Sequence, residues 1–274
     1  MLAEKIKKVF VYLVLIVGAI FMIFPFYWMI SGSFKTFVEY NSFPPVWIPS
    51  HFNLDNYIEA FRLAPLATYF KNSAIVTVCS VLINGFTTIL AAFGFSRMQF
   101  KGKEVLFAFL VAFMMVPFEM LVITNFQTVS KINLVNTLPV LIIPFTSSIF
   151  YTHILKGFFD TVSDSLYYSA RIDGASNWKY LWRVMVPIAR PSLVTVMLLN
   201  AIASWNSFMW VQLVIYSDKF RTIPLGVFMF VTEAGNLPHL QLAAATVSVL
   251  PMIILFLFAR KYIVNGVARG GIKG

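Results

Sequence analysis

The residues best suited to binding a polar solute lie within the fifth of six long apolar stretches. Asn200, Ser204 and Ser207 fall on one face of a helix there, flanked by the aromatic rings of Trp205 and Trp210. Amides and hydroxyls can hydrogen-bond the hydroxyl groups of a sugar, and aromatic rings can cover its apolar faces. The same side chains would also serve ordinary hydrogen bonding between packed helices. The sequence leaves both interpretations open.

Two other apolar stretches carry polar side chains. Glu119 is the only acidic residue placed inside an expected membrane span, and an ionisable group at that depth is a functional candidate by default. Lining of a solute pathway and simple placement near the membrane interface are equally open for it. Asn84 belongs to a stripe with Thr77, Ser80 and Thr88, which we interpret first as close helix packing and second as pathway lining.

A polar loop from Asp164 to Pro191 separates two apolar stretches. Asp164 is expected to cap a short helix that Gly174 ends in a left-handed conformation. Ser176 is expected to cap a second helix that ends at Pro187. These signals predict a bent pair of amphipathic helices at a membrane surface. The pair suits the docking of another protein, or alternatively a plain interfacial connector whose Trp and Tyr rings lie at headgroup depth.

The second helix of this pair is expected to have two different faces. Its apolar positions share one face: Trp178, Leu181, Trp182, Met185 and Val186. The other face, expected to meet water, carries Asn177, Lys179, Tyr180 and Arg183.

The elements that position these residues follow from composition. With 59% hydrophobic and 12% charged residues in a chain of 274, an all-α membrane protein with several spans is expected. Stretches long enough to cross a bilayer as helices are residues 9–30, 72–95, 105–126, 137–159, 191–216 and 241–264. The expected organisation is a tail and first span (1–30), an external segment (31–71), a core (72–264) containing the cytoplasmic loop 160–191, and a cytoplasmic tail (265–274).

The basic residues indicate the orientation of these six spans. Fifteen of the 21 Lys and Arg residues fall on the side that holds both termini and the 160–191 loop, and six fall on the other. The positive-inside rule therefore places both termini in the cytoplasm. The net charge of +10 is explained by this topology and by anionic lipid, so nucleic acid is not expected as a partner.

Several kinds of chemistry are not expected of this chain. Gly102-Lys103 is followed by Glu104 and has Arg97 where a phosphate-binding loop needs its first glycine, so ATP would have to be bound by another protein. Cys79 is the only cysteine, and no cluster of metal-ligating or nucleophilic residues is evident. We therefore expect no cofactor, no metal and no catalytic site.

The run Ala170–Ser176, followed by Pro187 and Pro191, resembles the cytoplasmic coupling loop of permeases from binding-protein-dependent ABC importers. The Gly-rich tail after Arg260 resembles the tail of the smaller permease subunit of maltose-type carbohydrate importers. The resemblance implies the ABC importer permease fold and the uptake of a sugar or oligosaccharide. A stand-alone secondary transporter of a small polar solute is the alternative, although carboxylate pairs for ion coupling are not evident.

The resemblance also implies which residues meet the ATPase. These are Tyr168, Ser169, Ala170, Asp173, Gly174, Ala175 and Pro187. The family's loop usually opens Glu-Ala-Ala, whereas this chain has Tyr168-Ser169-Ala170. The polar contact of the missing glutamate would then be made by Tyr168, or by Asp164 one helical turn earlier.

The resemblance further implies partners and a location. The partners are a second, homologous permease chain forming a heterodimer, two ATP-binding subunits that hold ATP and Mg²⁺, and an external solute-binding protein. Gly235, Asn236 and Pro238 are candidates for contact with that binding protein. The expected location is the cytoplasmic membrane of a bacterium or archaeon.

Overall fold

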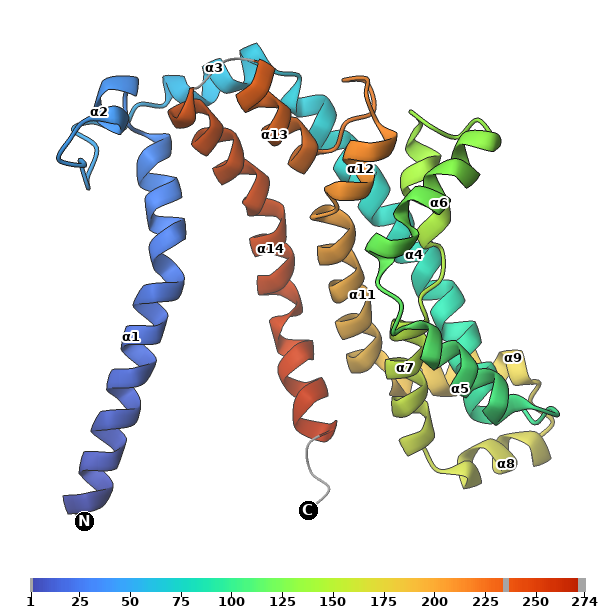
Figure 1. Ribbon diagram of the computed structural model, residues 1–274. Helices are drawn as coiled ribbons and strands as arrows, with labels where there is room; N and C mark the ends of the chain where they lie inside the picture. Colours follow the sequence, from blue (N-terminus) through green and yellow to red (C-terminus); the bar gives the residue numbers. More distant parts are fainter. Residues whose placement is uncertain (1, 234–236, 271–274) are drawn as a thin grey trace. The chain divides into compact units, whose positions relative to one another are not determined.

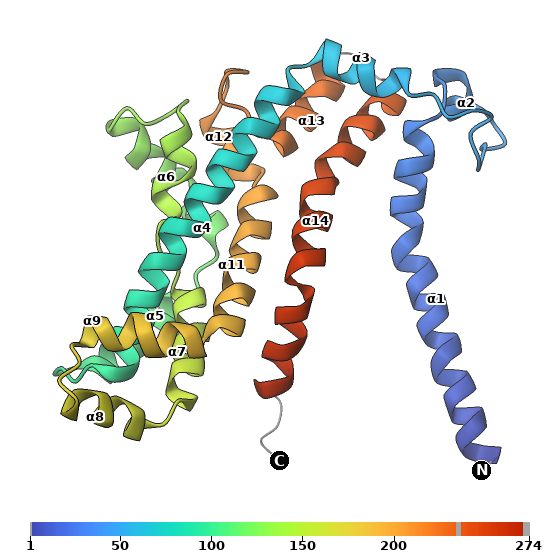
Figure 2. The ribbon, with the colours of Figure 1, turned by 180° about the vertical axis from the view of Figure 1, so that it is seen from behind.

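The structure, a computed structural model, describes residues 2–233 and 237–270, with side chains described over 4–228 and 237–260. Within these residues it is helical and contains no strand (Figures 1 and 2), which confirms the expected all-α class. The α-helices are α1 (Leu2–Ser33), α2 (Phe37–Asn41), α3 (Asp55–Leu63), α4 (Leu66–Arg97), α5 (Lys103–Phe113), α6 (Phe118–Lys131), α7 (Ile149–Thr161), α8 (Asp164–Ile172), α9 (Asn177–Tyr180), α10 (Val186–Ile188), α11 (Arg190–Trp205), α12 (Met209–Val214), α13 (Ile223–Glu233) and α14 (Pro238–Gly270).

Three of the described helices are each long and apolar enough to cross a membrane. They contain the spans Glu4–Ser33, Leu66–Arg97 and Pro238–Arg260. Three further helix pairs have the required length and hydropathy only when taken together, because each is bent at a short break. The bends are 95° between α5 and α6, 44° between Leu138–Phe145 and α7, and 82° between Asn177–Ile188 and α11.

The expected span over 105–126, which Pro117 interrupts in the sequence, consists of two helices. The chain leaves α5 at Phe113, turns, and re-enters helix at Phe118. Pro117, in extended backbone at the N-cap of α6, has no N–H to continue the hydrogen-bond ladder of α5. The sequence showed the proline but not the size of the bend.

Two other expected spans are also interrupted. The stretch 137–159 begins with two short 3₁₀ turns, Leu138–Leu141 and Ile143–Phe145, each with a proline in its first positions. The stretch 191–216 is divided because α11 ends at Trp205 and α12 begins at Met209. These interruptions place non-helical backbone within two of the apolar stretches.

The chain folds into two compact units. One holds the described parts of residues 1–67 and 226–250, and the other holds those of 68–225 and 251–274. In the first unit the ammonium group of Lys35, a buried residue, lies 4.0 Å from the centre of the Trp28 ring. Asn56 donates hydrogen bonds of 2.8 Å to the carbonyls of both Ser33 and Lys35. These contacts hold the chain that follows α1 against α3.

In the second unit α4 is the central helix. Its buried face includes Tyr69, Asn72, Ser73, Val76, Ser80, Asn84, Ile89, Ala92, Phe93 and Arg97. At 1.5 Å per residue, these positions extend over roughly 40 Å, which exceeds the thickness of a bilayer's hydrocarbon core. One helix therefore contacts every feature of this unit described below.

Candidate functional site

A cavity of about 310 Å³ lies midway along α4, wholly within the second unit. It is lined by Val76, Ser80, Asn84, Leu141, Phe145, Ser147, Ser148, Phe150, Tyr151, Asn200, Ala203, Ser204, Ser207, Val211 and Thr222. Four of the five residues predicted for pathway lining, Asn84, Asn200, Ser204 and Ser207, are among them. Glu119 is not, since it lies exposed in the first turn of α6. A carboxylate at that position interacts favourably with the positive end of the helix dipole.

Asn84 has a structural role in the cavity wall. Its amide donates to the carbonyl of Phe145 at 3.0 Å and accepts from the Thr88 hydroxyl at 3.1 Å. The hydroxyl of the neighbouring Thr87 donates to the carbonyl of Thr146 at 2.6 Å. Both carbonyls belong to the break before α7, where the backbone has no helical donor for them. The polar stripe of α4 therefore stabilises the bent span as well as lining the cavity.

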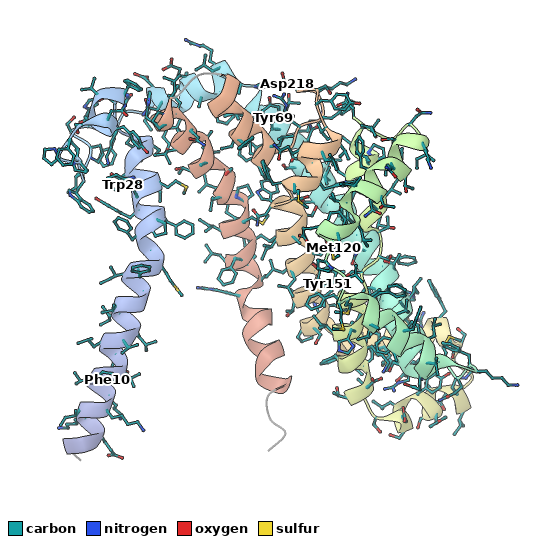
Figure 3. The ribbon with its side chains drawn as sticks, viewed as in Figure 1. Phe10, Trp28, Tyr69, Met120, Tyr151 and Asp218 are labelled. Carbon is teal, nitrogen blue, oxygen red and sulfur yellow. The ribbon has the colours of Figure 1, made fainter. Side chains whose placement is uncertain are left out.

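The aromatic residues beside the cavity are not the tryptophans that the sequence suggested. The Trp205 ring is buried against Phe70, with 6.2 Å between ring centres, and the Trp210 indole N–H donates to the carbonyl of Val140 at 3.0 Å. Phe145, Phe150 and Tyr151 line the cavity in their place (Figure 3 labels Tyr151).

These three residues could not be found by helical periodicity. Phe145 ends a 3₁₀ turn, and Phe150 and Tyr151 lie in the first turn of α7, just after the break. Their shared position depends on that break, which sequence reasoning did not predict.

The N-terminal part of α4 holds the loop between α12 and α13. The Tyr69 hydroxyl donates to the Asp218 carboxylate at 2.7 Å, and the two residues lie together in Figure 3. The Asn72 amide donates to the carbonyls of Lys219 and Arg221 at 2.9 and 2.8 Å. Asp218 also forms an ion pair with Arg221 at 2.6 Å.

Two further contacts complete this arrangement, which we call the loop clamp. The Ser73 hydroxyl accepts a 2.9 Å hydrogen bond from the backbone N–H of Ile223. On the other side of the loop, the Asn136 side-chain oxygen accepts from the N–H and the hydroxyl of Ser217 at 3.1 and 2.9 Å. The clamp fixes the backbone on both sides of Thr222, a cavity-lining residue. Sequence reasoning missed the clamp because its partners lie far apart in the chain.

At the other end of α4 lies the predicted pair of short helices, which we call the surface helix pair (Asp164–Ile188; Figures 1 and 2). Its first helix, α8, is capped by the Ser163 hydroxyl, so the expectation that Asp164 is the N-cap is wrong. Gly174 has a φ of +75°, which confirms the left-handed exit. The N–H groups of Ala175 and Gly174 donate to the carbonyls of Ala170 and Arg171, the pattern of a Schellman cap.

The second helix of the pair begins as predicted and then departs from regular geometry. Ser176 caps it by accepting from the N–H of Lys179 at 3.2 Å. Leu181–Met185 form a π-helical turn, and the helix continues one residue past Pro187 to Ile188. A π turn widens the helix and shifts the register of its faces.

This shift corrects the expected division into faces. Tyr180, expected to meet water, is fully buried, whereas Trp178, assigned to the apolar face, is exposed. Tyr180, Leu181 and Met185 join a core cluster with Ile89, Ala92, Phe93, Leu155, Phe159, Val162, Ala189 and Leu193. The surface helix pair is thus packed directly on α4 and α7.

Arg97, the last residue of α4, makes the polar part of this junction. Its guanidinium donates to the carbonyls of Phe159 and Val162 at the end of α7. It also lies 3.0 Å from the carboxylate of Asp164, the first residue of α8. The sequence predicted no structural role for Arg97, which counted only among the basic residues that indicate orientation and as the residue in place of a phosphate-loop glycine.

Most of the predicted ATPase-coupling residues lie on the surface. Tyr168, Ser169, Asp173, Gly174 and Pro187 are exposed, and Ala170 and Ala175 are half-buried. Apolar side chains are exposed beside them: Leu166, Ile172 and Trp178. A patch of exposed apolar side chains on a firmly anchored helix pair is typical of a protein-binding surface.

Two of the remaining predicted contacts, Gly235 and Asn236, lie outside the described residues, and Pro238 is half-buried at the first position of α14. Among the described residues no group of three or more His, Cys, Asp or Glu side chains is placed to hold a metal ion.

An apolar helical bundle with a polar-lined cavity suits a membrane protein that binds a polar solute. The family described as binding-protein-dependent transport system inner membrane component matches residues 83–269. The chain belongs to this family. It is a multi-pass membrane protein and a component of a transport system, which supports the importer interpretation over a stand-alone secondary transporter.

Relatives extend this similarity over the whole chain. It is 33% identical to the trehalose/maltose transport system permease protein MalG of Thermococcus litoralis, covering 99% of both chains. It is 30% identical to the arabinooligosaccharides transport system permease protein AraQ of Halalkalibacterium halodurans, covering 93% of both. In fold it is similar to a chain of a bacterial ABC transporter that imports the acidic polysaccharide alginate, with a TM-score of 0.82, 22% identity and coverage of 95% and 98%.

Proposed function

We propose that this chain is the permease subunit through which an ABC importer moves a sugar or oligosaccharide into the cell. Its relatives include permeases named for trehalose and maltose, arabinooligosaccharides and diacetylchitobiose. The cavity offers amide and hydroxyl groups beside aromatic rings, the combination that suits a carbohydrate.

The observation that carries this proposal is the double contact made by α4. Ser80 and Asn84 line the cavity, while Ala92, Phe93 and Arg97 of the same helix pack against the surface helix pair. A displacement of the pair therefore acts on the helix that forms the cavity wall. Such a rigid connection is what an importer needs if a partner outside the membrane supplies the energy.

The energy in this proposal comes from ATP hydrolysis in two separate ATPase subunits, which bind the ATP and Mg²⁺. They contact the surface helix pair through Tyr168, Ser169, Ala170, Asp173, Gly174, Ala175 and Pro187. A second, homologous permease completes the pathway as a heterodimer. A solute-binding protein delivers the sugar on the outer side, where Gly235, Asn236 and Pro238 are candidate contacts.

We further propose six spans, each bent pair counting as one, with both termini in the cytoplasm of a bacterium or archaeon. In this topology residues 31–71 are external, and residues 160–191 and 265–274 are cytoplasmic. The excess of Lys and Arg on the side of the termini supports it. The surface helix pair then meets the cytoplasm and the loop clamp meets the outside.

The structure favours Tyr168 over Asp164 as the replacement for the family's glutamate. Asp164 is already paired with Arg97, although 70% of its side chain is exposed, whereas Tyr168 is 60% exposed and its hydroxyl has no hydrogen-bond partner among the described residues. We therefore expect the Tyr168 hydroxyl to make the polar contact with the ATPase.

Reconstitution tests the proposal. The tagged chain is purified with whatever subunits accompany it and placed in proteoliposomes with the solute-binding protein. We expect sugar uptake that requires ATP. We also expect an ATPase to copurify with the wild-type chain and with Asp164→Ala, but not with Tyr168→Ala. Uptake by the chain alone without ATP would refute the proposal.

A further inference from the structure

We propose that the cavity beside α4 is a binding subsite for an uncharged, hydroxylated solute and that it discriminates against anionic sugars. This chain then selects neutral over anionic solutes itself, in addition to any selection by the solute-binding protein. This inference depends on the proposed function, because it assigns the chemistry of the solute that the pathway carries.

Two buried hydroxyl groups carry the first part of the inference. The Ser80 residue is 2% exposed and Thr222 is 4% exposed, and both line the cavity. Within the described part of the chain neither hydroxyl has a hydrogen-bond partner. A buried hydroxyl without a partner is costly, and a rotation about the Cα–Cβ bond of either side chain would let its hydroxyl bond a solute in the cavity and remove that cost.

The positions of these hydroxyls are fixed by the surrounding structure. Thr222 lies in the loop held by the loop clamp, between Arg221, whose carbonyl accepts from Asn72, and Ile223, whose N–H donates to Ser73. Ser80 lies in the middle of α4. The backbone that carries each hydroxyl is therefore preorganised, which reduces the cost of binding.

A third polar group belongs to the same wall. The side-chain amide of Asn200 lines the cavity and makes no hydrogen bond within the described residues, unlike that of Asn84. An amide offers both a donor and an acceptor, which matches the dual character of a sugar hydroxyl. Tyr151, Phe145 and Phe150 supply the aromatic surfaces that the apolar faces of a sugar ring require.

The second part of the inference rests on charge. None of the side chains that line the cavity is ionisable to a cation or a carboxylate at neutral pH. The guanidinium of Arg221, next in sequence to Thr222, forms an ion pair with Asp218 at 2.6 Å. A carboxylate, sulfonate or phosphate entering this cavity would lose its hydration without gaining a counter-charge, which is strongly unfavourable.

The experiment measures sugar binding to the assembled, nucleotide-free complex in detergent, without the solute-binding protein, by NMR line broadening of the sugar. The neutral probes are maltotriose, arabinotriose and diacetylchitobiose, and the anionic probe is trigalacturonate. We expect at least one neutral probe to bind, and trigalacturonate to bind at least about tenfold more weakly than the best of them. This comparison needs no variant.

Variants then locate the subsite. Ser80→Ala and Thr222→Val each remove one hydrogen bond and should raise the Kd of the neutral probe roughly 3–10-fold. The matched control is Thr195→Val, because the Thr195 hydroxyl bonds the Pro191 carbonyl at 3.0 Å and does not line the cavity. The control should bind the sugar with an unchanged Kd.

The outcomes separate the two proposals. Three outcomes would overturn the subsite: equal binding of trigalacturonate and the neutral probes, no binding of any probe, or an unchanged Kd in both cavity variants. The last outcome would mean that water alone satisfies the two hydroxyls. ATP-dependent uptake by the wild-type complex would still stand in each of these cases. Absence of any ATP-dependent uptake would instead overturn the proposed function.

Discussion

The guanidinium of Arg97 lies 3.0 Å from the carboxylate of Asp164, and it also binds the carbonyls of Phe159 and Val162. One side chain at the end of α4 thereby joins the end of α7 to the beginning of α8. Only 5% of the Arg97 side chain is exposed, against 70% for Asp164. The junction therefore combines two well-shielded contacts to backbone carbonyls with one ion pair open to solvent.

This difference in exposure predicts unequal effects of two substitutions. Arg97→Ala removes the donor of the buried Val162 carbonyl, one of the two donors of the Phe159 carbonyl and the charge partner of Asp164, and should lower the free energy of unfolding by about 3 kcal/mol or more. Asp164→Asn removes only an exposed ion pair and should cost at most about 1 kcal/mol. Thermal unfolding of the purified complex measures the loss of stability in each variant, and a separate assay of ATP-driven uptake measures the loss of function. Equal losses in the two variants would show that the ion pair dominates the junction.

Gly174 should tolerate no side chain with a branched Cβ. Its φ of +75° is readily available to glycine, whereas valine in this conformation is strained by about 1–2 kcal/mol. Gly174→Val is expected to loosen the Schellman cap of α8 and to reduce uptake per ATP hydrolysed, while the chain remains in the membrane. The matched control is Gly157→Ala, where nothing lies within 4 Å of the added Cβ. If Gly174→Val took up as much sugar per ATP hydrolysed as the wild type, the cap of α8 would not be needed for coupling.

Local sequence signals predicted local structure well. The cap at Ser176 and the left-handed Gly174 each depend on the backbone immediately around them, and both are present. The helical face of Asn200, Ser204 and Ser207 was also correct, because α11 is regular as far as Trp205 and Ser207 follows within one turn.

Features that depend on breaks in helices were not predictable in the same way. The π turn after Tyr180 rotated a face that a 3.6-residue period had assigned to water. The bend before α7 brought Phe145 and Tyr151 to the cavity. Arg97 and Asn72 act on carbonyls far away in the sequence, and no local pattern identifies such partners.

The loop clamp should control the mobility of residues 218–223. Asn72→Ala removes two hydrogen bonds to the loop, and Ser73→Ala removes the acceptor for the N–H of Ile223. Hydrogen exchange of the Ile223 amide should become faster in Ser73→Ala by roughly tenfold, as expected for the loss of about one hydrogen bond. Ser165→Ala, a surface serine on α8, serves as the control. An unchanged exchange rate would mean that the loop is held by its apolar contacts alone.

Acid should loosen the segment that follows α1. The Glu39 carboxylate accepts hydrogen bonds from the N–H groups of Ser50 and Thr36 at 3.1 and 2.9 Å. Hydrogen bonding by the Ser50 side chain, followed by the hydrogen bond from the Thr36 backbone, lowers the pKa of Glu39 from 4.5 to about 2. Because this pKa is depressed in the folded chain, the stabilisation is fully present above about pH 4.5 and is lost as the pH falls toward 2. Hydrogen exchange over residues 36–50, corrected for the intrinsic rate, should therefore rise between pH 5 and pH 2.

The variant Glu39→Gln isolates this carboxyl group from the others that titrate in the same range. Glutamine keeps the size of the side chain but has no acidic proton, so exchange over residues 36–50 should be faster than wild type at pH 5 and nearly independent of pH below it. The capping box of Thr36 and Glu39 would also be weakened, since an amide oxygen accepts hydrogen bonds less strongly than a carboxylate. If the variant kept the pH dependence of the wild type, another acidic group would have to cause the loss of protection in residues 36–50. The hydrogen bonds of Glu39 would then contribute little to the stability of that segment.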